Sequence, residues 1–337
     1  MLHLGRLPVI KCTPQIVRYA SKLYTSKPGE SYAHNDNSHL GDAISKNLET
    51  VPLAYDKISP TSATSIVRSP LIMVHGLFGS KSNTRTVAKQ LANELRRDVF
   101  SIDLRNFGSS PHHPRLDYPA LAADVERFIA NVITPEYESH KPICVGHSMG
   151  AKTVMALALR APKVPAMIVS VDNAPIDWSN GVSGGSTFAR YVRALRTALE
   201  KHRYTSIKDV DAELAKVEPN SYIRQFLLMN MKRGKKDEPI ESKIPLQIIG
   251  DAIVKGKIAL WPYDCHINRW NGPALFIRGT KSQYVPDDVI PTIGAYFPDF
   301  EVRDIDSGHW VISEKPEEFI SSVTDFITRK EDEEEIY

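Results

Sequence analysis

Residues 143–150, ICVGHSMG, contain the strongest structural signal in the chain. The first three residues are an apolar run typical of a buried strand, and a stretch of small, apolar residues typical of a helix begins at Met149. Between them, 146–150 fits G-x-S-x-G, which is weak alone but marks a nucleophile elbow when a strand precedes it and a helix follows. We therefore interpret Ser148 as a nucleophile at a helix N-terminus, where unpaired N–H groups favour an oxyanion. The alternative is an ordinary strand–helix turn.

Apolar strand-like runs and amphipathic helical stretches alternate on both sides of this elbow. Strands are predicted at 71–74, 99–104, 143–146, 167–171, 274–277 and 300–305. Helices are predicted at 84–97, 119–133, 149–161, 286–297 and 316–329. Continuously apolar strands separated by helices predict an α/β fold, with a mostly parallel sheet covered by helices on both faces.

The alternation stops between the fourth and fifth of these strands. Residues 177–271 are predicted to form a helical lid insertion, with helical spacing at 186–202, 207–217 and 220–232. The insertion divides the core into a first part, 51–176, and a second part, 272–330. It follows a strand end, so we expect it to lie over the carboxyl edge of the sheet, where open α/β sheets bind ligands.

The two ends of the chain differ from the core in composition. Residues 1–29 contain five Lys or Arg and no Asp or Glu, interleaved with apolar residues, which is typical of a mitochondrial presequence. A disordered basic tail is the alternative, and a secretory signal fits worse because no apolar core of about 7–15 residues is present. Residues 30–50 are polar and read as a linker, and 331–337 read as a solvated acidic tail.

Composition excludes several classes of protein. The 337 residues carry 42 Lys and Arg against 40 Asp and Glu, and no basic stripe with interleaved aromatic residues appears, so nucleic-acid binding has no support. The three cysteines lie far apart, which predicts neither a disulfide framework nor a zinc site. No apolar run reaches the ~18 residues of a membrane span. The pair His112-His113 is not at metal-ligand spacing with other ligands.

The loop 75–79, HGLFG, follows a predicted strand and is expected to complete an oxyanion hole. The backbone N–H of Met149, directly after the nucleophile, is the first predicted donor. Leu77 is the preferred second donor and Phe78 the alternative. We interpret His75 as a structural hydrogen-bonding residue, because buried histidines near strand ends often bond to the backbone.

The general base is expected late in the chain, because the order in such folds is serine, acid, histidine. His309, in DSGHW at 306–310, follows the last predicted strand and fits this order. The alternative for His309 is a histidine in a surface loop.

The acid has two possible positions. The usual loop, after the strand at 274–277, carries Ser282 where an aspartate is expected, and Asp287 and Asp288 come later at a helix start. Asp172 ends the strand next to the nucleophile strand, so its carboxylate is expected to reach His309. We favour Asp172, keep Asp287 and Asp288 as alternatives, and assign Ser282 a supporting hydrogen bond.

Four blocks together resemble one family: HGLFGS (75–80), DLRNFGS (103–109), GHSMGAK (146–152) and VDNAP (171–175). They are similar to the signature blocks of the α/β-hydrolase domain-containing protein 11 family, to which the yeast ethanol acetyltransferases are similar. The resemblance covers about 51–330. It implies an α/β-hydrolase fold, no cofactor, a mitochondrial address and an acid that follows the fourth strand. Two departures, Ala151 for glycine and Phe107 for histidine, lie beside the site.

The leading hypothesis is therefore acyl transfer from a short-chain ester or acyl-CoA thioester through an acyl-enzyme. Water as acceptor makes the protein an esterase or thioesterase; an alcohol makes it an acyltransferase, and the resemblance suggests acetyl-CoA and ethanol, giving ethyl acetate. The alternative is a non-catalytic hydrolase-fold protein that binds a partner through its insertion, and a serine peptidase is a weaker third. The sequence identifies no protein partner.

The acid-free basic N-terminus gives a prediction about location. A fluorescent protein fused to residues 1–40 should enter mitochondria, because a basic amphipathic segment of this composition directs import. Fluorescence microscopy with a mitochondrial marker measures this, and diffuse cytosolic signal would exclude the presequence.

Overall fold

The computed structural model describes residues 43–335, apart from 44, 46, 63–65, 139, 179–183, 233, 236 and 237. The predicted presequence, residues 1–29, and most of the predicted linker lie outside the described residues. No helix among the described residues combines the length and apolar character needed to cross a membrane.

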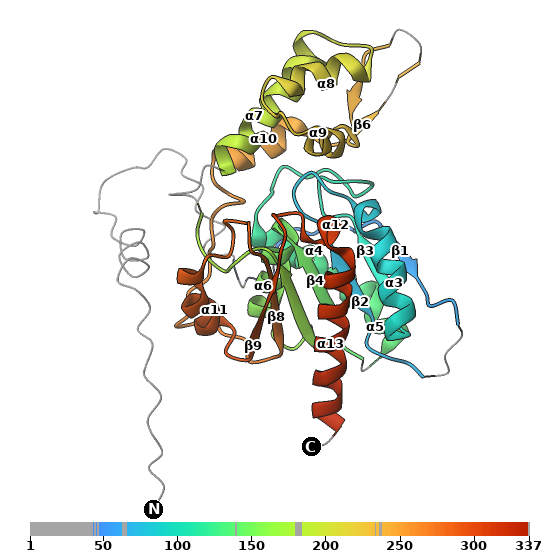
Figure 1. Cartoon of the computed structure of the whole chain (residues 1–337), viewed down its shortest axis with the longest axis vertical. Helices are drawn as coiled ribbons and strands as arrows, with labels where there is room; N and C mark the ends of the chain where they lie inside the picture. Colours follow the sequence, from blue (N-terminus) through green and yellow to red (C-terminus); the bar gives the residue numbers. More distant parts are fainter. Residues whose placement is uncertain are drawn as a thin grey trace, which may run out of the picture.

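A seven-stranded sheet lies at the centre of the described chain, in the order β1-β3-β2-β4-β5-β8-β9 (Figure 1). β1 pairs antiparallel with β3, and all the other neighbouring strands are parallel. The mostly parallel α/β sheet is thus confirmed. The strands are β1 (Tyr55–Ile58), β2 (Leu71–Val74), β3 (Val99–Ile102), β4 (Ile143–His147), β5 (Met167–Val171), β8 (Ala274–Gly279) and β9 (Phe300–Ile305).

The edge strand β1 is the one strand of this sheet that the sequence analysis did not predict. Its four residues alternate between exposed and partly buried, so they lack the continuous apolar run that identified the parallel strands.

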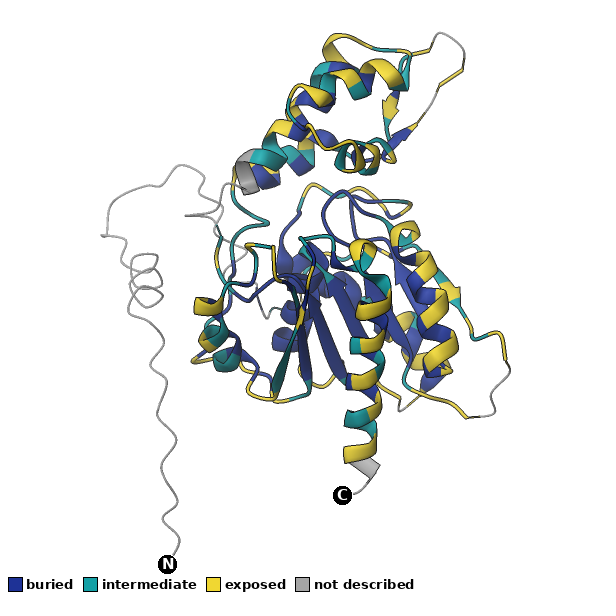
Figure 2. Cartoon of the chain, in the orientation of Figure 1, coloured by how far each residue is buried: buried dark blue, intermediate teal, exposed yellow. Residues whose placement is uncertain are grey.

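Helices cover both faces of the sheet because successive strand residues point to opposite sides. In β2, Leu71 and Met73 belong to the hydrophobic cluster that contains α3 and α13, whereas Ile72 and Val74 belong to the cluster that contains α4 and α6. Figure 2 shows the sheet buried between helices whose outer sides are exposed. The core helices are α3 (Arg85–Leu95), α4 (Tyr118–Phe128), α5 (Thr134–Tyr137), α6 (Met149–Arg160), α11 (Ile290–Tyr296), α12 (Val311–Glu314) and α13 (Pro316–Glu335).

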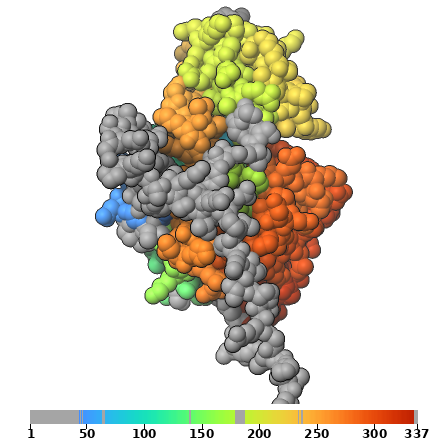
Figure 3. Space-filling view, turned by 90° about the vertical axis from the view of Figure 1, so that its left-hand side faces the viewer, coloured from blue at the N-terminus to red at the C-terminus, as the bar shows by residue number. Residues whose placement is uncertain are grey.

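The chain between β5 and β8 forms a mainly helical insertion, which makes a lobe at one end of the core (Figures 1 and 3). One prediction there is wrong: the helix expected over 220–232 ends at Leu228. The carbonyl of Asn230 accepts the N–H of Lys243 at 2.8 Å, and the chain then pairs as a two-stranded ribbon. The elements are α7 (Gly184–Arg196), α8 (Ile207–Ala215), α9 (Ser221–Leu228), β6 (Met231–Lys232), β7 (Glu241–Ser242) and α10 (Leu246–Val254).

Residues near the ends of the predicted insertion and of the predicted linker pack on the core. Trp270 donates from Nε1 to the Pro162 carbonyl at 3.0 Å, and Arg160 Nη2 donates to the Ser45 carbonyl at 2.9 Å. The predicted insertion, 177–271, and the predicted linker, 30–50, therefore both contain residues that contact the core.

The acidic run at 331–335, predicted as part of a solvated tail, instead continues helix α13. Glu331 accepts two hydrogen bonds from the guanidinium of Arg97, at 2.7 and 2.8 Å. This bidentate ion pair binds the end of α13 to the segment before β3. The acidic composition of the run does not by itself predict such a partner.

Candidate active site

Ser148 lies in a strained turn between β4 and α6. Its φ of 56° is positive, a conformation that costs a non-glycine residue about 1–3 kcal/mol and needs support from its surroundings. The Ser148 N–H donates to the Val171 carbonyl at 2.9 Å, and its carbonyl accepts from Asn173 Nδ2 at 3.1 Å. These two bonds fix the strained residue to the end of β5.

Both glycines of the elbow are required because α6 begins in close contact with β4 and β2. A Cβ on Gly146 would lie 2.1 Å from the Gly150 carbonyl oxygen, and a Cβ on Gly150 would lie 2.2 Å from the Val74 carbonyl oxygen. Neither distance is possible for a real side chain, so α6 can start against β4 and β2 only with glycine at both positions.

A hydrogen-bond chain joins the three residues predicted as nucleophile, base and acid. His309 Nε2 lies 2.9 Å from Ser148 Oγ, and His309 Nδ1 lies 2.6 Å from Asp172 Oδ2. Because a carboxylate only accepts, Nδ1 carries the proton, and the serine hydroxyl donates to Nε2. The structure thus brings together Ser148, Asp172 and His309 in the arrangement of a serine–histidine–aspartate triad.

Asp172 is completely buried and surrounded by donors. In addition to His309, it accepts the backbone N–H of Gly279 at 3.1 Å and the hydroxyl of Ser282 at 2.5 Å. These bonds orient the carboxylate, and Ser282 lies where the supporting hydrogen bond was predicted. A Cβ on Gly279 would lie 2.2 Å from the Gly308 carbonyl oxygen, so glycine there lets the loop that carries His309 come close.

The alternative acids lie away from this chain of hydrogen bonds. Asp287 is exposed and pairs with Arg278 at 2.5 Å, and Asp288 is exposed beside it. Both begin the 3₁₀ turn η4 (Asp287–Val289), and neither contacts His309 within the described part of the chain.

The predicted oxyanion donors are buried beside Ser148. Met149 is the first residue of α6, so its N–H has no acceptor within the helix. Among the described residues, neither Met149 N–H nor Leu77 N–H donates to a protein acceptor. A Cβ on Gly76, the residue before Leu77, would lie 3.1 Å from Ser148 Cβ. Both unpaired N–H groups therefore belong to segments that touch the serine.

His75 orients one of these donors through the peptide that joins Gly76 to Leu77. The Gly76 carbonyl accepts from His75 Nδ1 at 2.8 Å and from the Gly79 N–H at 3.0 Å. In a trans peptide the N–H points opposite to the C=O, so these bonds also set the direction of the Leu77 N–H. His75 Nε2 accepts the Leu104 N–H, and burial lowers the pKa of His75, so the ring is neutral and structural, in agreement with its interpretation from the sequence.

Two further ring contacts were not predicted from the sequence. His147 Nε2 donates to the His309 carbonyl at 2.8 Å, and burial together with the neighbouring His309 lowers the pKa of His147 to about 4, so this ring is neutral. The ring of Tyr284 lies 4.3 Å from that of His309, tilted by 32°. His147 stands in the quoted elbow motif, but no sequence pattern identifies a partner 162 residues away.

The insertion contacts loops on both sides of the serine. Asn230 Nδ2 donates to the Phe78 carbonyl at 2.8 Å, next to the proposed donor Leu77. The ring of Phe226 packs edge-on against Trp310, at 4.7 Å between centroids, directly after His309. The insertion therefore contacts both the loop that carries the predicted donor Leu77 and the loop that carries His309.

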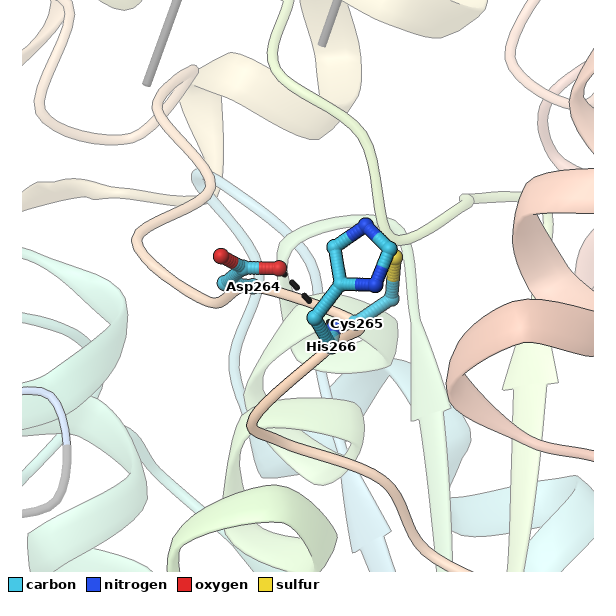
Figure 4. Close-up of side chains that lie close together, drawn as sticks. All are labelled: Asp264, Cys265 and His266. Atoms are coloured by element: carbon cyan, nitrogen blue, oxygen red, sulfur yellow. Dashed lines mark hydrogen bonds between the residues drawn. The ribbon is translucent and has the colours of Figure 1, made fainter. Parts of the chain in front are cut away.

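One cluster among the described residues has metal-ligand spacing: Asp264, Cys265 and His266, whose ligand atoms lie within 4.8 Å of one another (Figure 4). The Asp264 carboxylate accepts the backbone N–H of His266 at 2.9 Å, which is an Asx turn. This local turn accounts for the proximity of three consecutive residues.

Comparisons with known proteins identify the fold family. A family profile described as alpha/beta hydrolase fold matches residues 69–316. The chain is 41% identical over 308 residues to a probable alcohol acetyltransferase of Saccharomyces cerevisiae, covering 87% of this chain and 88% of the relative. It is 32% identical over 308 residues to an sn-1-specific diacylglycerol lipase ABHD11 of Xenopus laevis, covering 88% and 93%.

Among solved structures, a marine microorganism esterase superposes with a TM-score of 0.71 at 29% identity, covering 82% of this chain and all of the esterase. The profile match and the two relatives identify the family, and the solved esterase structure agrees with the fold. The chain belongs to the α/β-hydrolase fold family.

Proposed function

We propose that this protein is a serine acyl-transfer enzyme that forms an acyl-enzyme on Ser148. The observation that carries the proposal is the continuous hydrogen-bond chain from Ser148 through His309 to Asp172. Family membership supports a hydrolase or acyltransferase activity, and the chain of hydrogen bonds supplies the groups that such an activity needs.

In the first half of the reaction, Ser148 Oγ attacks the carbonyl carbon of an ester or thioester while its proton passes to His309 Nε2. Asp172 holds the imidazole in the required tautomer and stabilises the imidazolium. The negative oxygen of the tetrahedral intermediate accepts the N–H groups of Met149 and Leu77. The intermediate collapses, and the leaving alcohol or thiol takes the proton from His309.

In the second half, an acceptor attacks the acyl-serine and gives its proton to His309. Water releases a carboxylic acid; an alcohol releases a new ester. In both cases the proton returns to Ser148 Oγ, so one set of residues serves hydrolysis and alcohol acylation.

The names of the relatives guide the choice of substrates. The yeast relative is named as a probable alcohol acetyltransferase, which supports acetyl-CoA and ethanol as a first pair, giving ethyl acetate. The frog relative is named as a diacylglycerol lipase, which supports ester hydrolysis. The proposal includes a thioesterase activity toward short acyl-CoA and a mitochondrial location, the latter based on the composition of residues 1–29.

Replacement of the nucleophile tests the proposal. Purified protein from about residue 30 is given acetyl-CoA with and without ethanol, and ethyl acetate, acetate and free CoA are quantified. Ser148→Ala should lose turnover by about 10⁴-fold or more, since triad residues act as a unit. A fluorophosphonate probe should label the wild type and leave Ser148→Ala unlabelled. Unlabelled wild type without turnover would instead favour a non-catalytic protein that binds a partner.

Four substitutions test which residue is the acid. Asp172→Asn should lower turnover by something like 10⁴-fold, because an amide favours the wrong imidazole tautomer. Ser282→Ala removes one hydrogen bond to Asp172 and should cost about tenfold. Asp287→Asn is the matched control and should change turnover by about twofold or less, because its carboxylate is exposed. Full activity of Asp172→Asn together with loss in Asp287→Asn or Asp288→Asn would contradict the assignment.

A further inference from the structure

Lys152 is a completely buried lysine one helical turn beyond Ser148 on α6. Its ammonium donates to the carbonyl of Ile176 at 2.6 Å and to the carbonyl of Ala259 at 3.1 Å. Ile176 lies on the segment that leaves β5 for the insertion, and Ala259 lies on the segment that returns from α10. One side chain of the core therefore holds both connections of the insertion.

The surroundings of Lys152 strengthen the same junction. The Tyr118 hydroxyl donates to the Ile258 carbonyl at 2.7 Å, and the backbone N–H of Trp178 donates to the Ala259 carbonyl at 3.0 Å. The ammonium also lies 5.2 Å from the centre of the Tyr118 ring, a cation–π distance. The two connections are thus bonded to each other and to α4 and α6.

The charge on Lys152 is costly in this position. The carboxylate of Asp177 favours the charged form of Lys152, but burial outweighs this effect. Burial lowers the pKa of Lys152 to about 7, so the site disfavours the charged form. A methionine would fill similar space without that cost, so packing alone does not account for a lysine. An ammonium has three N–H donors and can satisfy two carbonyls at once.

We propose that Lys152 is a positioning residue that fastens both connections of the insertion to the nucleophile helix and so holds the insertion over the active site. The effect reaches the reacting groups through Asn230, which bonds to the oxyanion loop at Phe78, and through Phe226, which packs on Trp310 beside His309. The expected effect on catalysis rests on the proposed function. The role of Lys152 in holding the two connections of the insertion does not.

Hydrogen exchange measured by mass spectrometry tests the fastening without any substrate. In Lys152→Met, exchange should rise about tenfold or more in α7 and α10, because the two hydrogen bonds from Lys152 to the connections are lost. Exchange in β4 and β5 should stay at the wild-type rate or fall, because removing a buried charge is often neutral or stabilising for the core. Lys152→Gln keeps two N–H donors, so its exchange rates in α7 and α10 should lie between those of the wild type and those of Lys152→Met. Lys208→Met, which changes an exposed lysine of the insertion, should match the wild type.

Unchanged exchange in α7 and α10 of Lys152→Met would overturn the proposal. An equal rise in β4 and β5, or failure of the variant to fold, would also overturn it, because Lys152 would then be a structural residue of the core. With an acetyl ester as substrate, kcat/KM of Lys152→Met should fall about tenfold while fluorophosphonate labelling of Ser148 is retained. If the wild type neither turns over esters nor is labelled, the proposed function fails, and the exchange measurement still decides the role of Lys152.

Discussion

The close approach of helix α6 to strands β4 and β2 is the constraint on which the site depends. Gly146 and Gly150 permit it, since a Cβ at either position would overlap a carbonyl oxygen. The approach forces Ser148 into a positive φ and leaves the Met149 N–H without an intrahelical acceptor. It also sets the direction of α6, which brings Lys152 under the two connections of the insertion.

The carboxyl ends of the parallel strands collect the remaining groups. Asp172 follows β5, Gly279 ends β8, and the loop after β9 carries His309, so residues far apart in sequence meet at one edge of the sheet. Each group is in turn held by a neighbour outside the proposed chemistry: His75 orients the peptide of Leu77 through the Gly76 carbonyl, and His147 bonds to the carbonyl of His309. Burial keeps both of these histidines neutral, so they donate from one nitrogen without adding charge beside Ser148.

The parallel strands and the elbow could be predicted because their signals are local: apolar runs, helical spacing and a motif with strand and helix on either side. Asp172 could be favoured because adjacent parallel strands end at the same edge. The edge strand β1 and the ribbon of β6 and β7 escaped prediction because short, half-exposed strands depend on pairing with distant residues. The contacts of Lys152, Tyr284 and Glu331 could not be predicted for the same reason, because the tertiary fold brings their partners close from distant parts of the sequence.

A covalent intermediate on Ser148 is the central claim, and its direct detection tests it best. The protein is mixed with acetyl-CoA without alcohol, quenched in acid within the first turnover and digested for peptide mass spectrometry. The account predicts one acetyl group on the peptide that contains Ser148. When ethanol is added before the quench, this acetyl group should disappear and an equal amount of ethyl acetate should form. Formation of ethyl acetate or acetate with no acetyl group on Ser148, or with the acetyl group on another residue, would contradict it.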